Sequence, residues 1–94
     1  METAGTQLDA RVYGRVQMVG FRAFVLDRAR GLGLSGWVRN GEDGSLQVRA
    51  EGPLADLRSL LAALHEGPSA ARVDQVDASW GAATGEGRGF EVRP

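Results

Sequence analysis

The sequence contains no cysteine and no lysine, and each absence excludes a class of chemistry. Without cysteine the chain has no disulfide framework, no zinc-thiolate centre and no thiol nucleophile. All eleven basic residues are arginine, so a Schiff-base or general-base lysine is excluded as well. Arginine suits phosphate and carboxylate groups, but a preference this uniform is typical of coding bias and singles out no position.

A strong charge of one sign and a long apolar run are also missing. Eleven arginines and twelve acidic residues give a net charge of -1 at pH 7, so no overall field attracts nucleic acid or an anionic membrane. No apolar run has the length of a signal or membrane-spanning segment. We therefore expect a cytoplasmic monomer without nucleic-acid or membrane partners, in which any anion site is local.

The chain of 94 residues is long enough for one self-sufficient domain. We expect a single domain over residues 1–94, with the polar residues 1–6 as a disordered N-terminus. Apolar residues alternate with period two, which predicts strands, at residues 8–13, 34–39, 46–51, 71–80 and 90–92. Gly14 is expected to end the first strand, and a change of phase near Asp74 and Gln75 predicts a β-bulge.

Two segments follow helical spacing instead. The first begins at Phe21, stops at Gly31 and Gly33, and has an apolar face of Phe21, Phe24, Val25, Ala29 and Leu32. The second follows Pro53, closes at Gly67, and has an apolar stripe of Leu54, Leu57, Leu60, Leu61 and Leu64. The order β-α-β-β-α-β with an extra C-terminal strand predicts an α+β fold, the ferredoxin-like α/β sandwich, with two helices on one face of an antiparallel sheet. That fold hosts binding modules, regulators and enzymes alike.

The connection from the first strand to the first helix is the strongest candidate for chemistry. Gly14 and Gly20 allow tight turns, and the free N–H groups of a helix beginning near Phe21 would face the connection. A turn of this kind is a ready anion site. A bound anion would also offset Arg22, which is unfavourable in a first helical turn. Plain turn glycines and a solvated arginine explain the same spacing.

Other polar residues give weaker signals. Asn40 ends the second predicted strand in phase with Val38, and its amide can donate to and accept from a water, although Asn before Gly is also a common hairpin pair. His65, the only histidine, has no carboxylate or serine partner at a motif spacing, so we interpret it as a residue that caps a helix C-terminus. No carboxylate set predicts a metal site. The remaining aromatic and acidic strand residues are interpreted as packing or solvated positions: Trp37, Trp80, Glu51, Asp74 and Asp77.

Two stretches together resemble the acylphosphatase family. Residues 12–22, Val-Tyr-Gly-Arg-Val-Gln-Met-Val-Gly-Phe-Arg, resemble its first signature. Residues 36–40, Gly-Trp-Val-Arg-Asn, followed by Gly-Ser-Leu at 44–46 and by Gly52, resemble its second. Two long motifs in the right order and on the right elements make a specific match, and it covers essentially the whole domain.

The resemblance implies a hydrolase that cleaves acyl phosphates, carboxyl-phosphate mixed anhydrides, to carboxylate and inorganic phosphate. It implies no metal and no other cofactor, and inorganic phosphate as product and competitive inhibitor. Arg22 would be the charged clamp and Asn40 would hold the attacking water. The phosphate-binding residues it implies are Gln17, Met18, Val19, Gly20, Phe21 and Arg22. A carboxylate leaving group with a pKa of about 4 needs little help from a general acid, so the lack of a credible base is no objection.

Two positions depart from the family pattern. Leu46 stands where valine is usual, which is a conservative apolar change. Met18 stands where glycine is usual, and a positive φ there would strain the loop and misdirect an amide. Because the flanking motif residues are intact, we expect a negative φ, with Met18 at the pocket rim favouring apolar acyl groups.

Other functions stay open. A non-catalytic ferredoxin-like module that binds an anion or regulates a partner would keep Arg22 and have no need for Asn40. RNA binding on the open sheet face requires exposed stacking aromatics and a basic platform, and only Tyr13 and Trp37 fit. A stand-alone relative of acylphosphatase-like domains in larger enzymes is a further alternative.

Overall fold

The computed structural model describes residues 5–85 and 87–94 of the chain. Its elements follow the order predicted from the sequence, and their bounds are β1 Thr6–Arg15, α1 Phe21–Gly31, β2 Ser35–Asn40, β3 Leu46–Gly52, α2 Leu54–Glu66, β4 Arg72–Ala82 and β5 Phe90–Val92. Thr6, expected in the disordered N-terminus, already pairs with Gly52 and Ala82, so the sheet begins earlier than expected. Residues 1–4 of the expected tail lie outside the described residues.

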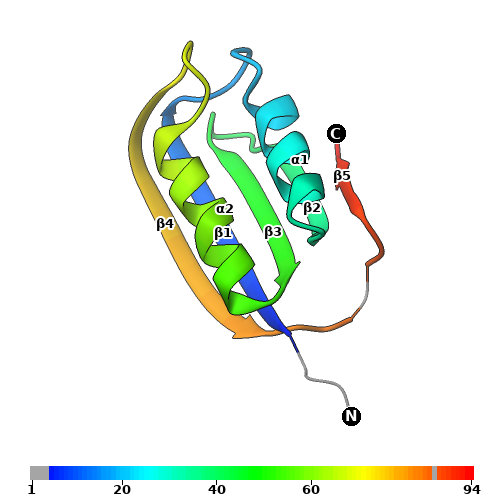
Figure 1. Ribbon diagram of the computed structural model, residues 1–94. Helices are drawn as coiled ribbons and strands as arrows, with labels where there is room; N and C mark the ends of the chain where they lie inside the picture. Colours follow the sequence, from blue (N-terminus) through cyan, green and yellow to red (C-terminus); the bar gives the residue numbers. More distant parts are fainter. Residues whose placement is uncertain (1–4, 86) are drawn as a thin grey trace.

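The strands form one sheet in the order β4-β1-β3-β2-β5, and α1 and α2 cover one of its faces (Figure 1). The pairings among β4, β1, β3 and β2 are antiparallel, as expected. The extra strand β5 instead runs parallel to β2. The sheet is therefore mixed, because the chain crosses from the β4 edge to the opposite edge and enters β5 in the direction of β2.

The core lies between the sheet and the two helices. Leu8, Ala10 and Val12 of β1 point into it and are buried, while Asp9 and Arg11 lie on the open face. Burying a large apolar side chain stabilises the fold by about 1.5–3 kcal/mol, so the alternating pattern fixes which face carries the helices. The helices bury Phe21, Val25, Ala29, Leu57, Leu60, Ala63 and Leu64.

A β-bulge interrupts the pairing of β1 with β4. Tyr13 pairs with Gln75, whereas the next residue, Gly14, pairs with Val73, which leaves Asp74 as the extra residue. The bulge predicted from the change of phase is confirmed. Gly14 does not end β1, as was expected, because the strand continues beyond the bulge.

Glu51 fixes the connection that follows β4. Its carboxylate accepts hydrogen bonds from Gln7 Nε2 (2.6 Å), from the Thr84 N–H and hydroxyl (both 2.9 Å) and from the Gly85 N–H (3.0 Å). Burial raises the pKa of Glu51, but these hydrogen bonds outweigh it and lower the pKa to about 2. Glu51 is therefore a structural anchor and not the solvated position that the sequence suggested.

The β1–α1 connection and the β2–β3 hairpin lie at the same end of the sheet, at the top of Figure 1. The first follows Arg15 and the second follows Asn40. Since β1 and β2 run in the same direction, with β3 between them and antiparallel to both, the two motif segments meet at one end although they are far apart in the chain.

Candidate active site

The β1–α1 connection is a short loop whose φ angles alternate in sign. The angle is positive at Met18 (61°) and at Gly20 (80°), and negative at Gln17 and Val19. Alternation of this kind turns successive backbone N–H groups toward one concave side, the nest arrangement that binds anions. Val16, only 1% exposed, anchors the start of the loop in the core.

The positive φ of Met18 shows that the negative φ expected from the sequence was wrong. A residue with a Cβ atom in the left-handed region costs about 1–2 kcal/mol. The Met18 side chain is 99% exposed, so little packing offsets this cost. The intact flanking residues did not reveal the angle, because the closure of the loop sets it and not the identity of the neighbours.

The start of helix α1 faces this loop without a side-chain cap. Gly20 is the N-cap, no side chain bonds to the first turn, and no acidic residue lies there. The first hydrogen bond of the helix runs from the Phe24 N–H to the Gly20 carbonyl oxygen at 3.1 Å, so the preceding N–H groups have no acceptor within the helix. Phe21 is buried and holds the helix start against the core. A fixed, uncapped helix start beside a nest favours an anion.

Arg22 is exposed in this first turn and makes no hydrogen bond or ion pair with the described residues. Other arginines of α1 have partners: Arg28 lies 4.6 Å from the centre of the Phe24 ring, and Arg30 donates to the Phe90 carbonyl oxygen at 3.2 Å. A cation at the positive end of a helix is unfavourable unless an anion binds to both.

Asn40 is the last residue of β2 and is half-buried. It pairs with Leu46, which is buried in the core, so its side chain lies on the face covered by the helices. This is the side predicted from its phase with Val38. Within residues 5–85 and 87–94 its side-chain amide forms no hydrogen bond, which leaves both its donor and its acceptor for a substrate or a water.

Gln17 connects the loop to the hairpin. Its side-chain Nε2 donates to the carbonyl oxygens of Gly41 (2.9 Å) and Ser45 (3.0 Å). The two donor hydrogens are thereby used, so the side chain supports the site, and only its backbone N–H could contribute to an anion nest. The sequence predicted Gln17 as a phosphate-binding residue and did not predict this connection.

The hairpin itself is held by a small polar network. The Ser45 hydroxyl and its N–H (3.0 Å) both donate to the Asp43 carboxylate, and the Gly41 N–H donates to the Ser45 carbonyl oxygen at 2.7 Å. The hydrogen bond from the Ser45 hydroxyl, followed by that from its N–H, lowers the pKa of Asp43 below its usual value. An Asp two residues before a Ser in a turn is the sequence signal for this arrangement, and it was missed.

The remaining candidates lie away from this end of the sheet or have other partners. His65 is exposed in the last turn of α2, as predicted for a capping residue. Asp74 pairs with Arg72 at 3.0 Å, and Asp77 accepts from Gln75 at 2.7 Å. Among the described residues, no three or more histidine and carboxylate side chains are placed to hold a metal ion. No helix in that part of the chain is long and apolar enough to cross a membrane.

Comparisons with known proteins agree with this geometry. The acylphosphatase family profile matches residues 8–92. The acylphosphatase of Salinibacter ruber is 54% identical over 95 residues, which cover 99% of either chain. The crystal structure of acylphosphatase from Bacillus subtilis, 34% identical, superimposes with a TM-score of 0.91 over 95% of this chain and 99% of that one. An acylphosphatase structure from Coxiella burnetii, 35% identical, gives a TM-score of 0.84 over 96% of this chain and 94% of that one. The chain therefore belongs to the acylphosphatase family.

Proposed function

We propose that this chain, an acyl phosphate hydrolase like its family, binds the phosphoryl group in the loop Gln17–Phe21. Arg22 is the charged clamp, and Asn40 holds the attacking water. The observation that carries the proposal is one arrangement at one end of the sheet: an anion nest, an unpaired Arg22 and a free Asn40 amide, joined through Gln17.

The reaction requires little beyond positioning and charge stabilisation. Water attacks phosphorus, the bond between phosphorus and the bridging oxygen breaks, and the carboxylate leaves with the bonding electrons. Its conjugate acid has a pKa of about 4, so no general acid is needed. The proton of the water passes to a phosphoryl oxygen, and the product is inorganic phosphate. A loose transition state places charge on the equatorial oxygens, where backbone N–H groups and Arg22 stabilise it.

Met18 supports a preference for apolar acyl groups. Its side chain is 99% exposed beside the nest, and a flexible thioether makes favourable contacts with aromatic rings. We expect Met18→Gly to lose selectivity for benzoyl phosphate over acetyl phosphate while its affinity for inorganic phosphate is kept. An unchanged ratio of kcat/KM for the two substrates would remove Met18 from the acyl site.

The experiment that tests the proposal is hydrolysis of benzoyl phosphate, followed by the loss of anhydride absorbance. Arg22→Ala should lower kcat/KM by about 100-fold or more, since one strong oxyanion contact contributes roughly 3 kcal/mol. Arg58→Ala, which removes an exposed arginine of α2, is the matched control and should leave the rate unchanged. A folded Arg22→Ala protein with wild-type kcat/KM would refute the assignment.

Asn40 distinguishes an enzyme from an anion-binding module. If it holds the water, Asn40→Ala lowers kcat and leaves the inhibition constant of inorganic phosphate nearly intact. If it only shapes the hairpin, the variant loses thermal stability and keeps its kcat, and Asn40→Gly is harmless. The second result would favour the binding module.

A further inference from the structure

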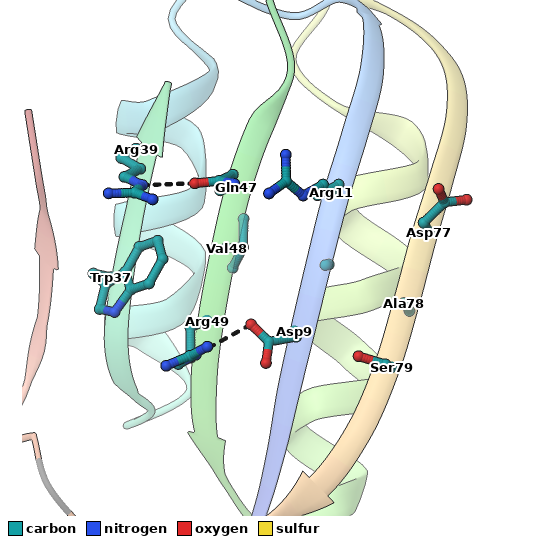
Figure 2. A pocket seen from close by; sticks show the side chains of 11 residues that line it. Asp9, Arg11, Trp37, Arg39, Gln47, Val48, Arg49, Asp77, Ala78 and Ser79 are labelled. Atoms are coloured by element: carbon teal, nitrogen blue, oxygen red, sulfur yellow. Dashed lines mark hydrogen bonds and ion pairs between the residues drawn. The ribbon is translucent and has the colours of Figure 1, made fainter. Parts of the chain in front are cut away.

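The sheet face opposite the helices carries a second polar basin, shown in Figure 2. It has a volume of about 550 Å³ and lies across β2, β3, β1 and β4. No residue of the Gln17–Arg22 loop lines it, and neither does Asn40. The inference drawn from it is therefore independent of the proposed hydrolysis. Cavities of this size commonly hold small molecules.

Arg39 is the anion-binding group of this basin that lacks a carboxylate partner. Its Nε donates to the neutral amide oxygen of Gln47 at 2.6 Å. Arg49, by contrast, is paired with Asp9 at 3.1 Å. The bond to Gln47 fixes the Arg39 guanidinium while leaving its charge uncompensated, so the group is ordered for an incoming anion.

Trp37 supplies an aromatic surface beside Arg39. Its ring centre lies 5.2 Å from the Arg39 guanidinium carbon and 5.7 Å from that of Arg49. The guanidinium of Arg93, at 5.3 Å, is near the same ring from the β5 side. Contacts of this kind hold the guanidinium planes against the indole and so restrict their freedom before a ligand binds. Trp37 is half-buried, so part of its ring remains accessible.

The acidic residues of the basin limit the charge that it can attract. Asp9 is engaged by Arg49, and Asp77 accepts from Gln75 at 2.7 Å. Three arginines and two aspartates line the basin, which leaves one net positive charge. A small anion fits this balance. A nucleic-acid strand does not, because the chain has a net charge of -1 and the basin a single aromatic residue.

We propose that this basin binds a nucleoside phosphate, with the base stacked on Trp37 and the phosphate on the guanidinium of Arg39. An aromatic surface and an ordered, uncompensated guanidinium in one basin match a ligand with a planar ring and a compact anion. Each half alone binds less well, because stacking and the charged hydrogen bonds contribute separately.

The test uses the two tryptophans of the chain. Trp80 pairs with Leu8 and does not line the basin, so a Trp80→Phe protein reports on Trp37 alone. Titration with AMP at low ionic strength should quench its fluorescence. In ¹⁵N NMR spectra the amide signals of Ala10, Val48 and Ala78, which also line the basin, should shift with the same dissociation constant. Adenosine and ribose 5-phosphate should each bind about tenfold more weakly than AMP.

Variants decide which groups carry the binding. Arg39→Gln should weaken AMP binding by about tenfold, whereas Arg58→Gln, on the helix-covered side, should not change it. Trp37→Leu, followed by NMR, should remove the preference for AMP over ribose 5-phosphate. The proposal is overturned by unchanged Trp37 emission and amide shifts, by equal binding of ribose 5-phosphate and AMP, or by wild-type affinity in Arg39→Gln. It is also overturned if an oligodeoxythymidylate binds at these residues and AMP does not.

Discussion

The side-chain amide of Gln17 donates to the carbonyl oxygen of Gly41 at 2.9 Å and joins the β1–α1 loop to the β2–β3 hairpin. The same nitrogen donates to the Ser45 carbonyl oxygen at 3.0 Å. Gly41 directly follows Asn40, and Gln17 begins the loop that leads to Arg22. The bond therefore fixes the two halves of the proposed site relative to each other.

Replacement of Gln17 by methionine should lower both stability and turnover. Two part-buried carbonyl oxygens lose their donor, which costs about 1–2 kcal/mol of the free energy of unfolding. Turnover should fall because Asn40 is no longer held against the loop. Urea unfolding and benzoyl phosphate hydrolysis measure the two effects. Gln75→Met, at an exposed position of β4, is the control, and if both variants behaved alike the connecting role would be wrong.

Met18→Gly should stabilise the chain. Removal of the Cβ atom relieves the left-handed backbone at Met18, for a net gain of about 1 kcal/mol after the extra freedom of glycine in the unfolded chain. Val19→Gly is the matched control: its φ is negative and its side chain packs against the core, so it should destabilise. A Met18→Gly protein that unfolds at lower urea concentration than wild type would show that the position is not strained.

The parts of this fold that follow from local patterns could be predicted from the sequence. The helix stops at Gly31 and Gly67, the alternation in β1 and the bulge at Asp74 each arise from a few neighbouring residues. The pairing of β5 could not be predicted, because alternation identifies a strand but not its partner or direction. Met18 shows the same limit, since its φ is set by the closure of the whole loop.

The candidate site was predicted in part for a similar reason. The two signature segments identify Arg22 and Asn40, and the fold brings their segments to one end of the sheet. The side-chain bonds of Gln17 and the anchoring of Glu51 join residues 24 to 44 positions apart. No spacing in the sequence reveals contacts of that kind.

Gly14→Ala should destabilise the chain strongly. At Gly14 φ is 130°, and an added Cβ atom would lie 2.2 Å from the carbonyl oxygen of Arg72 in β4. The clash and the backbone strain together should cost about 2–4 kcal/mol of the free energy of unfolding. Gly81→Ala, in the same strand pair with no atom near its Cβ position, should change stability little. Equal urea midpoints for the two variants would contradict the β1–β4 register at the bulge.

Glu51→Gln should lower stability at neutral pH and lose its effect in acid. The folded pKa of Glu51, about 2, lies below its ordinary value of 4.5, so its contribution is fully present above pH 4.5. It is lost as the pH falls toward 2. At pH 7 we expect a loss of about 1 kcal/mol, since solvent screens part of the interaction. Urea unfolding between pH 2 and 7 measures it, with Glu66→Gln as control, and a constant difference across that range would exclude the anchor.

The central claim is that the loop Gln17–Phe21 and Arg22 bind the phosphoryl group, and a titration of the ¹⁵N-labelled chain with inorganic phosphate tests it most directly. The largest amide shifts should fall on residues 17–23, with a dissociation constant equal to the inhibition constant measured against benzoyl phosphate. Arg22→Ala should weaken both constants by about tenfold or more. Largest shifts outside this loop, or equal phosphate affinity in wild type and Arg22→Ala, would contradict the account.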